Sequence, residues 1–319
     1  MHVVTRVYKC RSWNLFGAHG AEALSAELPK CQKLRALNLS GCHMCGAGTT
    51  AVAAAIAACK ELTAVLLRHN SCGVSSATAL ATAVASLPQL AQVDLCWNGI
   101  GSAGCAELAT TMHDSAVCHF DLRANGVGDG GAAALAQHLP KTLTHLELHS
   151  NDISAQGAAA LAQDLLPELS LSYLGLGANL LQDDGITALC AALPRMHTLA
   201  AVDLSRNGIT AQGTVELAYA LASLPLLTDL HMGHNSIGNE GAIAIVSACA
   251  TLRNVRSIGL AHNGITSAAA PSLVPQLRQL ASLAQLDLCQ NELCKNANGS
   301  CESIAWSLPS CCKLCVTIA

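Results

Sequence analysis

Three glycines in the segment DLRANGVGDGGAAALAQHL (121–139) have a spacing that could bind a nucleotide. Gly126, Gly128 and Gly131 spell G-x-G-x-x-G, after an apolar run typical of a strand and before a segment of helical composition. In a dinucleotide-binding fold this loop occurs once, and an acidic residue follows about twenty positions later. Here the third glycine has equivalents along the whole chain: Gly20, Gly48, Gly104, Gly157, Gly185, Gly213 and Gly241. We therefore interpret these glycines as part of a repeat and expect no nucleotide cofactor.

The repeat is marked by an asparagine that ends each copy of L-x-x-L-x-L-x-x-N. The segment LTAVLLRHN ends at Asn70, and further copies end at Asn98, Asn125, Asn151, Asn179, Asn207, Asn235, Asn263 and Asn291. The copies are 28 residues apart, except for spacings of 27 from Asn98 to Asn125 and 26 from Asn125 to Asn151. Cys42 replaces the asparagine in LRALNLSGC, and a weaker copy ends at Asn14. We expect one solenoid over residues 1–319, with about eleven repeats of 26–28 residues.

The pattern L-x-x-L-x-L-x-x-N/C-x-L resembles that of leucine-rich repeats over nearly the whole chain. The 28-residue period and the following I-x-x-x-G-x-x-x-L-A-x-x-L resemble the ribonuclease-inhibitor-like subclass. That subclass includes ribonuclease inhibitors, Ran GTPase-activating proteins and the sensor regions of NOD-like receptors. The resemblance implies an α/β horseshoe, with parallel strands on the concave face and helices on the convex face.

Chain geometry independently favours alternating strands and helices. Parallel strands need connections of about a dozen residues, which are usually helical and right-handed. Leu135 and Leu161, each ten residues after a repeat asparagine, are expected to begin such helices. The asparagine side chain would satisfy backbone groups in its own and neighbouring turns.

Composition excludes several classes of function. The net charge of −4 provides no broad basic surface, so we expect no nucleic acid partner. No apolar stretch is long enough to span a membrane, and the N-terminus does not resemble a signal peptide. The protein is therefore expected to be cytoplasmic, with its 17 cysteines as thiols.

Two C-x-x-C pairs could suggest a zinc or redox site. The first pair is Cys42 and Cys45, and Cys42 already has a structural role because it occupies the position of the repeat asparagine. Cys312 and Cys315 of the second pair fall in one predicted strand, where an offset of three residues places them on opposite faces. We therefore expect no metal site.

The predicted concave face carries the candidate binding residues. Polar and aromatic side chains gather there in the third to seventh repeats: Arg68, His69, Asp94, Trp97, His119, Asp121, Arg123, His145, Glu147, His149 and Tyr173. Tryptophan, tyrosine and arginine are frequent anchors of protein interfaces. The acidic residues are expected to form an exposed row that steers a partner. The alternative is a solvated sheet face without a ligand.

Two His–acid pairs, His119–Asp121 and His145–Glu147, could suggest acid–base catalysis or metal binding. An open sheet offers little desolvation to tune such pairs, so we expect no catalytic residues. The leading hypothesis is a non-catalytic protein-interaction scaffold. A ribonuclease inhibitor and a GTPase activator of the Ran type are the alternatives, although the sequence lacks the inhibitors' C-terminal Tyr–Asp pair and the activators' acidic tail.

The two ends of the chain lack an evident polar cap, which suggests part of a longer array or self-association at the C-terminal edge. Six cysteines concentrate near that edge, where oxidation is expected to cause aggregation: Cys289, Cys294, Cys301, Cys311, Cys312 and Cys315.

Overall fold

The computed structural model describes residues 8–9, 17–165, 169–293 and 313–315. The chain divides into two units, Met1–Asp152 and Ile153–Ala319, which are described separately. In each unit, short parallel strands alternate with helices, so the predicted α/β repeat fold is confirmed.

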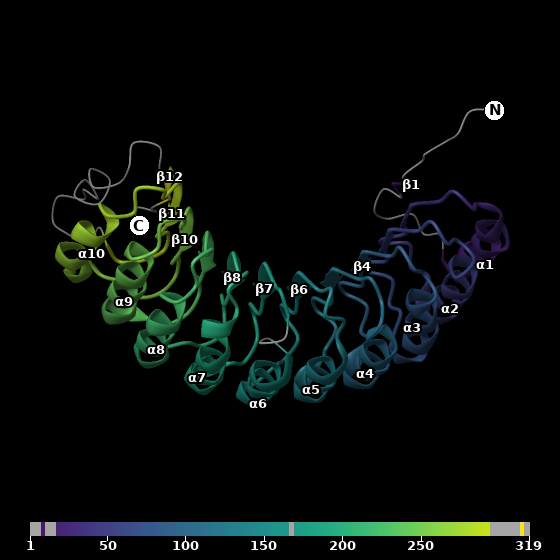
Figure 1. The fold of residues 1–319 in the computed structure, drawn as a ribbon, viewed down its shortest axis with the longest axis horizontal. Helices are drawn as coiled ribbons and strands as arrows, with labels where there is room; N and C mark the ends of the chain where they lie inside the picture. The colour runs from purple at the N-terminus through teal and green to yellow at the C-terminus, as the bar shows by residue number, and fades with distance from the viewer. Residues whose placement is uncertain (1–7, 10–16, 166–168, 294–312, 316–319) are drawn as a thin grey trace. The chain divides into compact units, whose positions relative to one another are not determined.

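Unit 1 contains strands β1–β6 and helices α1–α5. The strands are β1 (Tyr8–Lys9), β2 (Ala36–Asn38), β3 (Ala64–Leu66), β4 (Gln92–Asp94), β5 (His119–Asp121) and β6 (His145–Glu147). The helices are α1 (Gly17–Glu27), α2 (Cys45–Ile56), α3 (Ala77–Ala85), α4 (Gly101–Met112) and α5 (Gly128–His138). Each strand pairs with the next in chain order, and the helices lie on one side of the strands (Figure 1).

Unit 2 repeats this arrangement. Its strands are β7 (Tyr173–Gly175), β8 (Ala201–Asp203), β9 (Asp229–His231), β10 (Ser257–Gly259), β11 (Gln285–Asp287) and β12 (Lys313–Cys315). Its helices are α6 (Ala155–Ala160), α7 (Gln182–Ala192), α8 (Ala211–Leu221), α9 (Gly238–Ala250) and α10 (Ala270–Leu277).

The helices begin earlier than the leucine pattern predicted. Helix α5 begins at Gly128, so Leu135 lies well inside it, and α6 begins at Ala155 and ends before Leu161. The leucines mark the buried side of the helical segment rather than its start.

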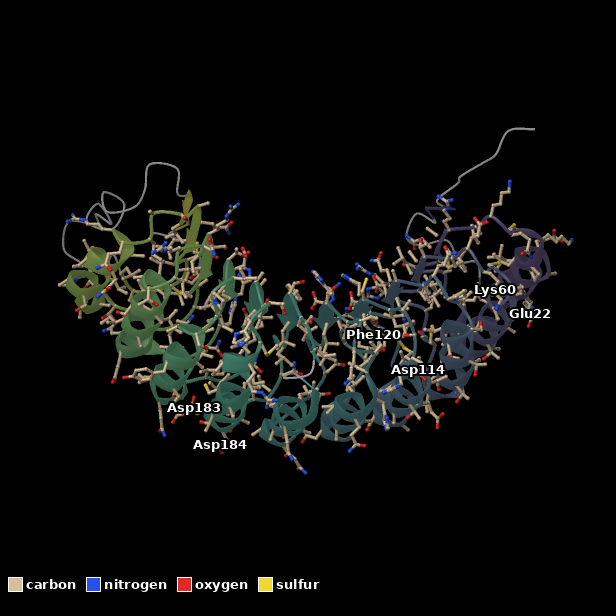
Figure 2. The ribbon with its side chains drawn as sticks, in the orientation of Figure 1. Glu22, Lys60, Asp114, Phe120, Asp183 and Asp184 are labelled. Atoms are coloured by element: carbon tan, nitrogen blue, oxygen red, sulfur yellow. The ribbon has the colours of Figure 1, made fainter. Side chains whose placement is uncertain are left out.

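The core of unit 1 lies between the strands and the helices. The middle residue of each three-residue strand is buried, as in Val65, Val93 and Phe120, which are paired in register. Phe120 lies between the strand row and the helices (Figure 2). Burial of each such side chain contributes about 1.5–3 kcal/mol relative to exposure. Because side chains alternate along a strand, the flanking residues lie on the opposite face, which we call the strand face.

The repeat asparagines form a hydrogen-bonded series that links successive turns. The Nδ2 of Asn98 donates to the carbonyl oxygens of Leu67 (2.9 Å) and Leu95 (2.8 Å). Its Oδ1 accepts from the backbone N–H groups of Asn70 (2.9 Å) and Cys72 (3.4 Å). One side chain thus satisfies donors and acceptors from two repeats, as predicted.

The series has one exception among the described residues. The Oδ1 of Asn263 is buried and accepts no hydrogen bond, although its Nδ2 donates to Met232.

The glycine pattern has a structural explanation in unit 1. Gly126 and Gly128 have φ of 66° and 58°, a conformation that side chains with a Cβ rarely adopt. Gly131 lies against the preceding helix, where an added Cβ would be 3.3 Å from the Cβ of Cys105 and 3.4 Å from the Cα of Ser102. The three glycines therefore allow a tight turn and close packing between helices.

Candidate functional site

The strand face of β3–β6 brings the predicted residues of unit 1 into adjacent rows. The register pairs Gln92 with His119, and His119 with His145. The same register aligns Asp94, Asp121 and Glu147. The imidazole rings of His119 and His145 are stacked, with centroids 5.1 Å apart.

The acidic residues of this face are less exposed than the sequence predicted. Asp94 and Asp121 are each only 1% exposed, so the expected exposed acidic row is wrong at these two positions. Their side chains fold back onto the turn that follows each strand. The Oδ1 of Asp94 accepts from the N–H of Cys96 (3.2 Å), and the Oδ1 of Asp121 accepts from the N–H of Arg123 (3.1 Å).

Two arginines cover these carboxylates. Arg123 binds Asp121 through Nε (3.0 and 3.1 Å to the two oxygens) and Nη2 (2.5 Å). Arg68 binds Asp94 through Nε, and its Nη2 lies 3.5 Å from Asp121. The arginine side chains are 45% (Arg68) and 34% (Arg123) exposed, so the surface over the carboxylates is formed by guanidinium groups.

The ionisation of these groups follows from burial and pairing. Burial raises the pKa of the Asp94 carboxyl above its usual range, with the neighbouring Asp121 charge acting in the same direction and Arg68 against it. Hydrogen bonding to Asp121 raises the pKa of Arg123, which remains charged. Two adjacent buried carboxylates would repel one another, and the arginines offset that repulsion.

Trp97 lies at the edge of the strand face. It is 57% exposed, and its ring is stacked on His69 of the preceding repeat with centroids 5.4 Å apart. Both residues have positive φ, 58° for Trp97 and 53° for His69. The neighbouring thiol of Cys96 is buried, and burial raises its pKa to about 11. The indole is therefore available to a partner, whereas the thiol next to it is part of the core.

Other side chains bind the carboxylates of the two His–acid pairs suggested by the sequence. Asp121 is bound by the two arginines, and Glu147 is bound by His149, with Nδ1 2.6 Å from Oε2. Burial lowers the pKa of His145, the nearby His119 adds to this effect, and Glu147 acts against it. Within residues 8–9, 17–165, 169–293 and 313–315, no three His, Cys, Asp or Glu side chains are placed to hold a metal ion.

The remaining predicted residue, Tyr173, begins β7 and is half-buried, but it lies in unit 2. Of the six C-terminal cysteines, Cys294, Cys301, Cys311 and Cys312 lie outside the described residues. The proposed self-association of this edge stays a prediction.

Sequence reasoning missed a basic cluster in unit 2. Arg206, His234 and His262 each directly precede a repeat asparagine, and all three are exposed. The Nη2 of Arg206 lies 3.3 Å from the Nε2 of His234, and the rings of His234 and His262 are stacked with centroids 4.2 Å apart. The 28-residue spacing of the three positions could have revealed this alignment.

Comparison with known proteins supports the repeat assignment. A family model described as Leucine Rich repeat matches residues 30–53, 119–136, 140–162, 195–218 and 223–246. The chain contains leucine-rich repeats. No curated protein matches the sequence.

Solved structures with similarity to this chain are distant in sequence. A chain from the yeast Rad7–Elc1 complex has 17% identity and a TM-score of 0.49, over 93% of this chain and 86% of that one. An internalin (inlF) from Listeria monocytogenes str. 4b F2365 has 17% identity and a TM-score of 0.47, over 95% of this chain and 94% of that one. None of the helices in the described residues is long and apolar enough to cross a membrane.

Proposed function

We propose that the strand face of unit 1 binds a protein partner and that the protein is a non-catalytic interaction scaffold. The observation that carries this proposal is the exposed Trp97 ring, stacked on His69 at the edge of a face covered by Arg68 and Arg123. Repeat folds of this type display extended surfaces that commonly bind other proteins. The proposal includes the cytoplasmic location expected from the sequence.

The chemistry of this face indicates what a partner would contact. Indole and imidazole rings offer flat apolar surfaces, and guanidinium groups donate hydrogen bonds in a planar arrangement. A matching partner would place aromatic side chains and hydrogen-bond acceptors against them. Burial of Asp94 and Asp121 argues against the alternative of a ribonuclease inhibitor, which would need exposed acids against a basic enzyme.

The test compares partner capture by the wild-type protein and by Trp97→Ala. A partner retained by the wild type is identified by mass spectrometry, and its affinity for both proteins is then measured by calorimetry. We expect Trp97→Ala to weaken binding by about 2 kcal/mol or more, as at other interface hot spots.

Alanine at this position is compatible with the fold, because Ala124 holds the equivalent place in the next repeat with φ of 51°. Tyr219→Ala is the matched control, since this aromatic residue is 80% exposed but belongs to helix α8 of unit 2. Equal affinity of the partner for the wild type and for Trp97→Ala, with unchanged circular dichroism, would show that the partner does not bind at this face.

A further inference from the structure

We propose that the basic cluster of unit 2, formed by Arg206, His234 and His262, binds an oxyanion on an acidic peptide segment of a partner. This site lies outside the strand face of unit 1 and does not depend on the function proposed for that face. The ligand group is a carboxylate or a phosphate, both of which accept hydrogen bonds from guanidinium and imidazole N–H groups.

The backbone holds the three side chains in register. The N–H of Arg206 donates to Gly233 (2.9 Å), that of His234 to Ala261 (2.7 Å) and that of His262 to Cys289 (2.9 Å). All three residues have positive φ, from 52° to 59°. Each side chain therefore leaves the backbone in the same conformation, and the three form a row along one edge of the unit.

The charge of Arg206 is not neutralised within unit 2. No carboxylate oxygen in the described part of the chain lies within 4.0 Å of its guanidinium, whereas Arg68 and Arg123 of unit 1 are both paired with aspartate. Its side-chain partner is instead the Nε2 of His234, which must be unprotonated to accept this hydrogen bond. An exposed arginine bound only to a neutral ring retains its capacity to bind an anion.

A shallow depression of about 420 Å³ adjoins the cluster. Arg206 and His234 line it together with Gln182, Gly208 and the exposed Leu180. Gly208 contributes no side chain to the depression, and the Gln182 amide adds hydrogen-bond donors to its lining. The carboxylate of Asp183, which is next to Gln182, accepts hydrogen bonds from the N–H (2.8 Å) and the hydroxyl (2.5 Å) of Thr210. Figure 2 shows Asp183 among the helices of this unit.

An anion would also change the protonation of His234. Partial burial lowers the pKa of His234, the neighbouring Arg206 and His262 act in the same direction, and Asp287 acts against them. A bound oxyanion would favour protonation of His234, which would then donate to the ligand. Binding should consequently tighten as the pH falls from 8 to 6.

The experiment titrates the full-length protein with three peptides of one sequence that carry a central phosphoserine, glutamate or serine. Affinity is measured by fluorescence anisotropy at low salt. We expect the phosphoserine peptide, the glutamate peptide or both to bind, the serine peptide to bind at least tenfold more weakly, and Arg206→Gln to abolish this difference.

Glutamine suits this backbone position, because Gln290 occupies its equivalent with φ of 57°. Arg278→Gln, at an exposed arginine that directly follows helix α10, is the matched control and should bind as the wild type does. The proposal is overturned if all three peptides bind alike, if none binds, or if Arg206→Gln retains the wild-type preference. Trp97→Ala should leave this binding unchanged, which separates the result from that for the strand face of unit 1.

Discussion

The guanidinium of Arg68, two residues after β3, reaches across β4 to lie 3.5 Å from the carboxylate of Asp121 on β5. Because Arg68 also binds Asp94 on β4, one side chain spans three consecutive repeats. Ion pairs therefore link the repeats across the strand face, in addition to the backbone hydrogen bonds between the strands.

Asp121→Asn should lower the free energy of unfolding by about 2 kcal/mol, because it leaves the partly buried Arg123 without its carboxylate and removes the second of the two carboxylates near Arg68. Asparagine can still accept the turn hydrogen bond, as Asn38 does from the N–H of Ser40 (3.0 Å). Urea denaturation measures the change. The matched control is Asp287→Asn, whose carboxylate also accepts a turn hydrogen bond, from Cys289 (3.0 Å), and should alter stability by less than about 0.5 kcal/mol. Similar stabilities for the two variants would contradict this role of the arginines.

Asn98→Ala should destabilise the protein by about 2–4 kcal/mol, because it leaves buried donors and acceptors of two repeats unsatisfied. Chemical denaturation and hydrogen exchange at the neighbouring turns would detect the loss. Asn254→Ala is the control, since Asn254 is exposed and its amide donates one hydrogen bond to Pro225 (2.9 Å). A change at Asn98 no larger than at Asn254 would show that the asparagine series contributes little to stability.

Gly131→Ala should cost about 1–3 kcal/mol through overpacking against Val127, which precedes its own helix α5, and against the preceding helix α4. Its Cβ would lie 2.7 Å from Cγ1 of Val127. Adding Val127→Ala should recover part of the loss, as thermal denaturation of the double variant would show. If Gly131→Ala were neutral, close helix packing would not explain this glycine.

His145 should make stability depend on pH. Its pKa is lowered in the folded protein, so the unfolded chain binds a proton more readily and the free energy of unfolding falls as the pH decreases through the ordinary histidine range near 6.5. Urea denaturation at pH 7.5 and 5.5 should show a smaller difference for His145→Gln than for the wild type. The same substitution at the exposed His113 serves as the control. A difference as large in His145→Gln as in the wild type would assign the effect to other groups.

The fold was predictable because the same contacts recur in every repeat. The asparagine, the leucines and the close-packed glycine appear in the sequence at one period, so each copy supports the others. That residues 1–319 form one solenoid stays a prediction, supported by the unbroken 28-residue step from Asn151 to Asn179.

The site was harder to predict, because strand alternation gives the face of a side chain but not its exposure. Asp94 and Asp121 point to the strand face as expected, yet a turn hydrogen bond and an arginine bury each of them. A signal was present in Asn38, which occupies the same position in an earlier repeat. An exchange between asparagine and aspartate indicates a turn acceptor more directly than a steering charge.

The left-handed residue before each repeat asparagine separates the requirements of folding from those of recognition. Its backbone conformation is the same in successive repeats, while its side chain extends from the edge and varies widely in size and charge. Substitutions at this one position per repeat can therefore change binding specificity with little loss of folding stability. The occupants are Gly41, which precedes Cys42, and His69, Trp97, Ala124, Ser150, Ala178, Arg206, His234, His262 and Gln290.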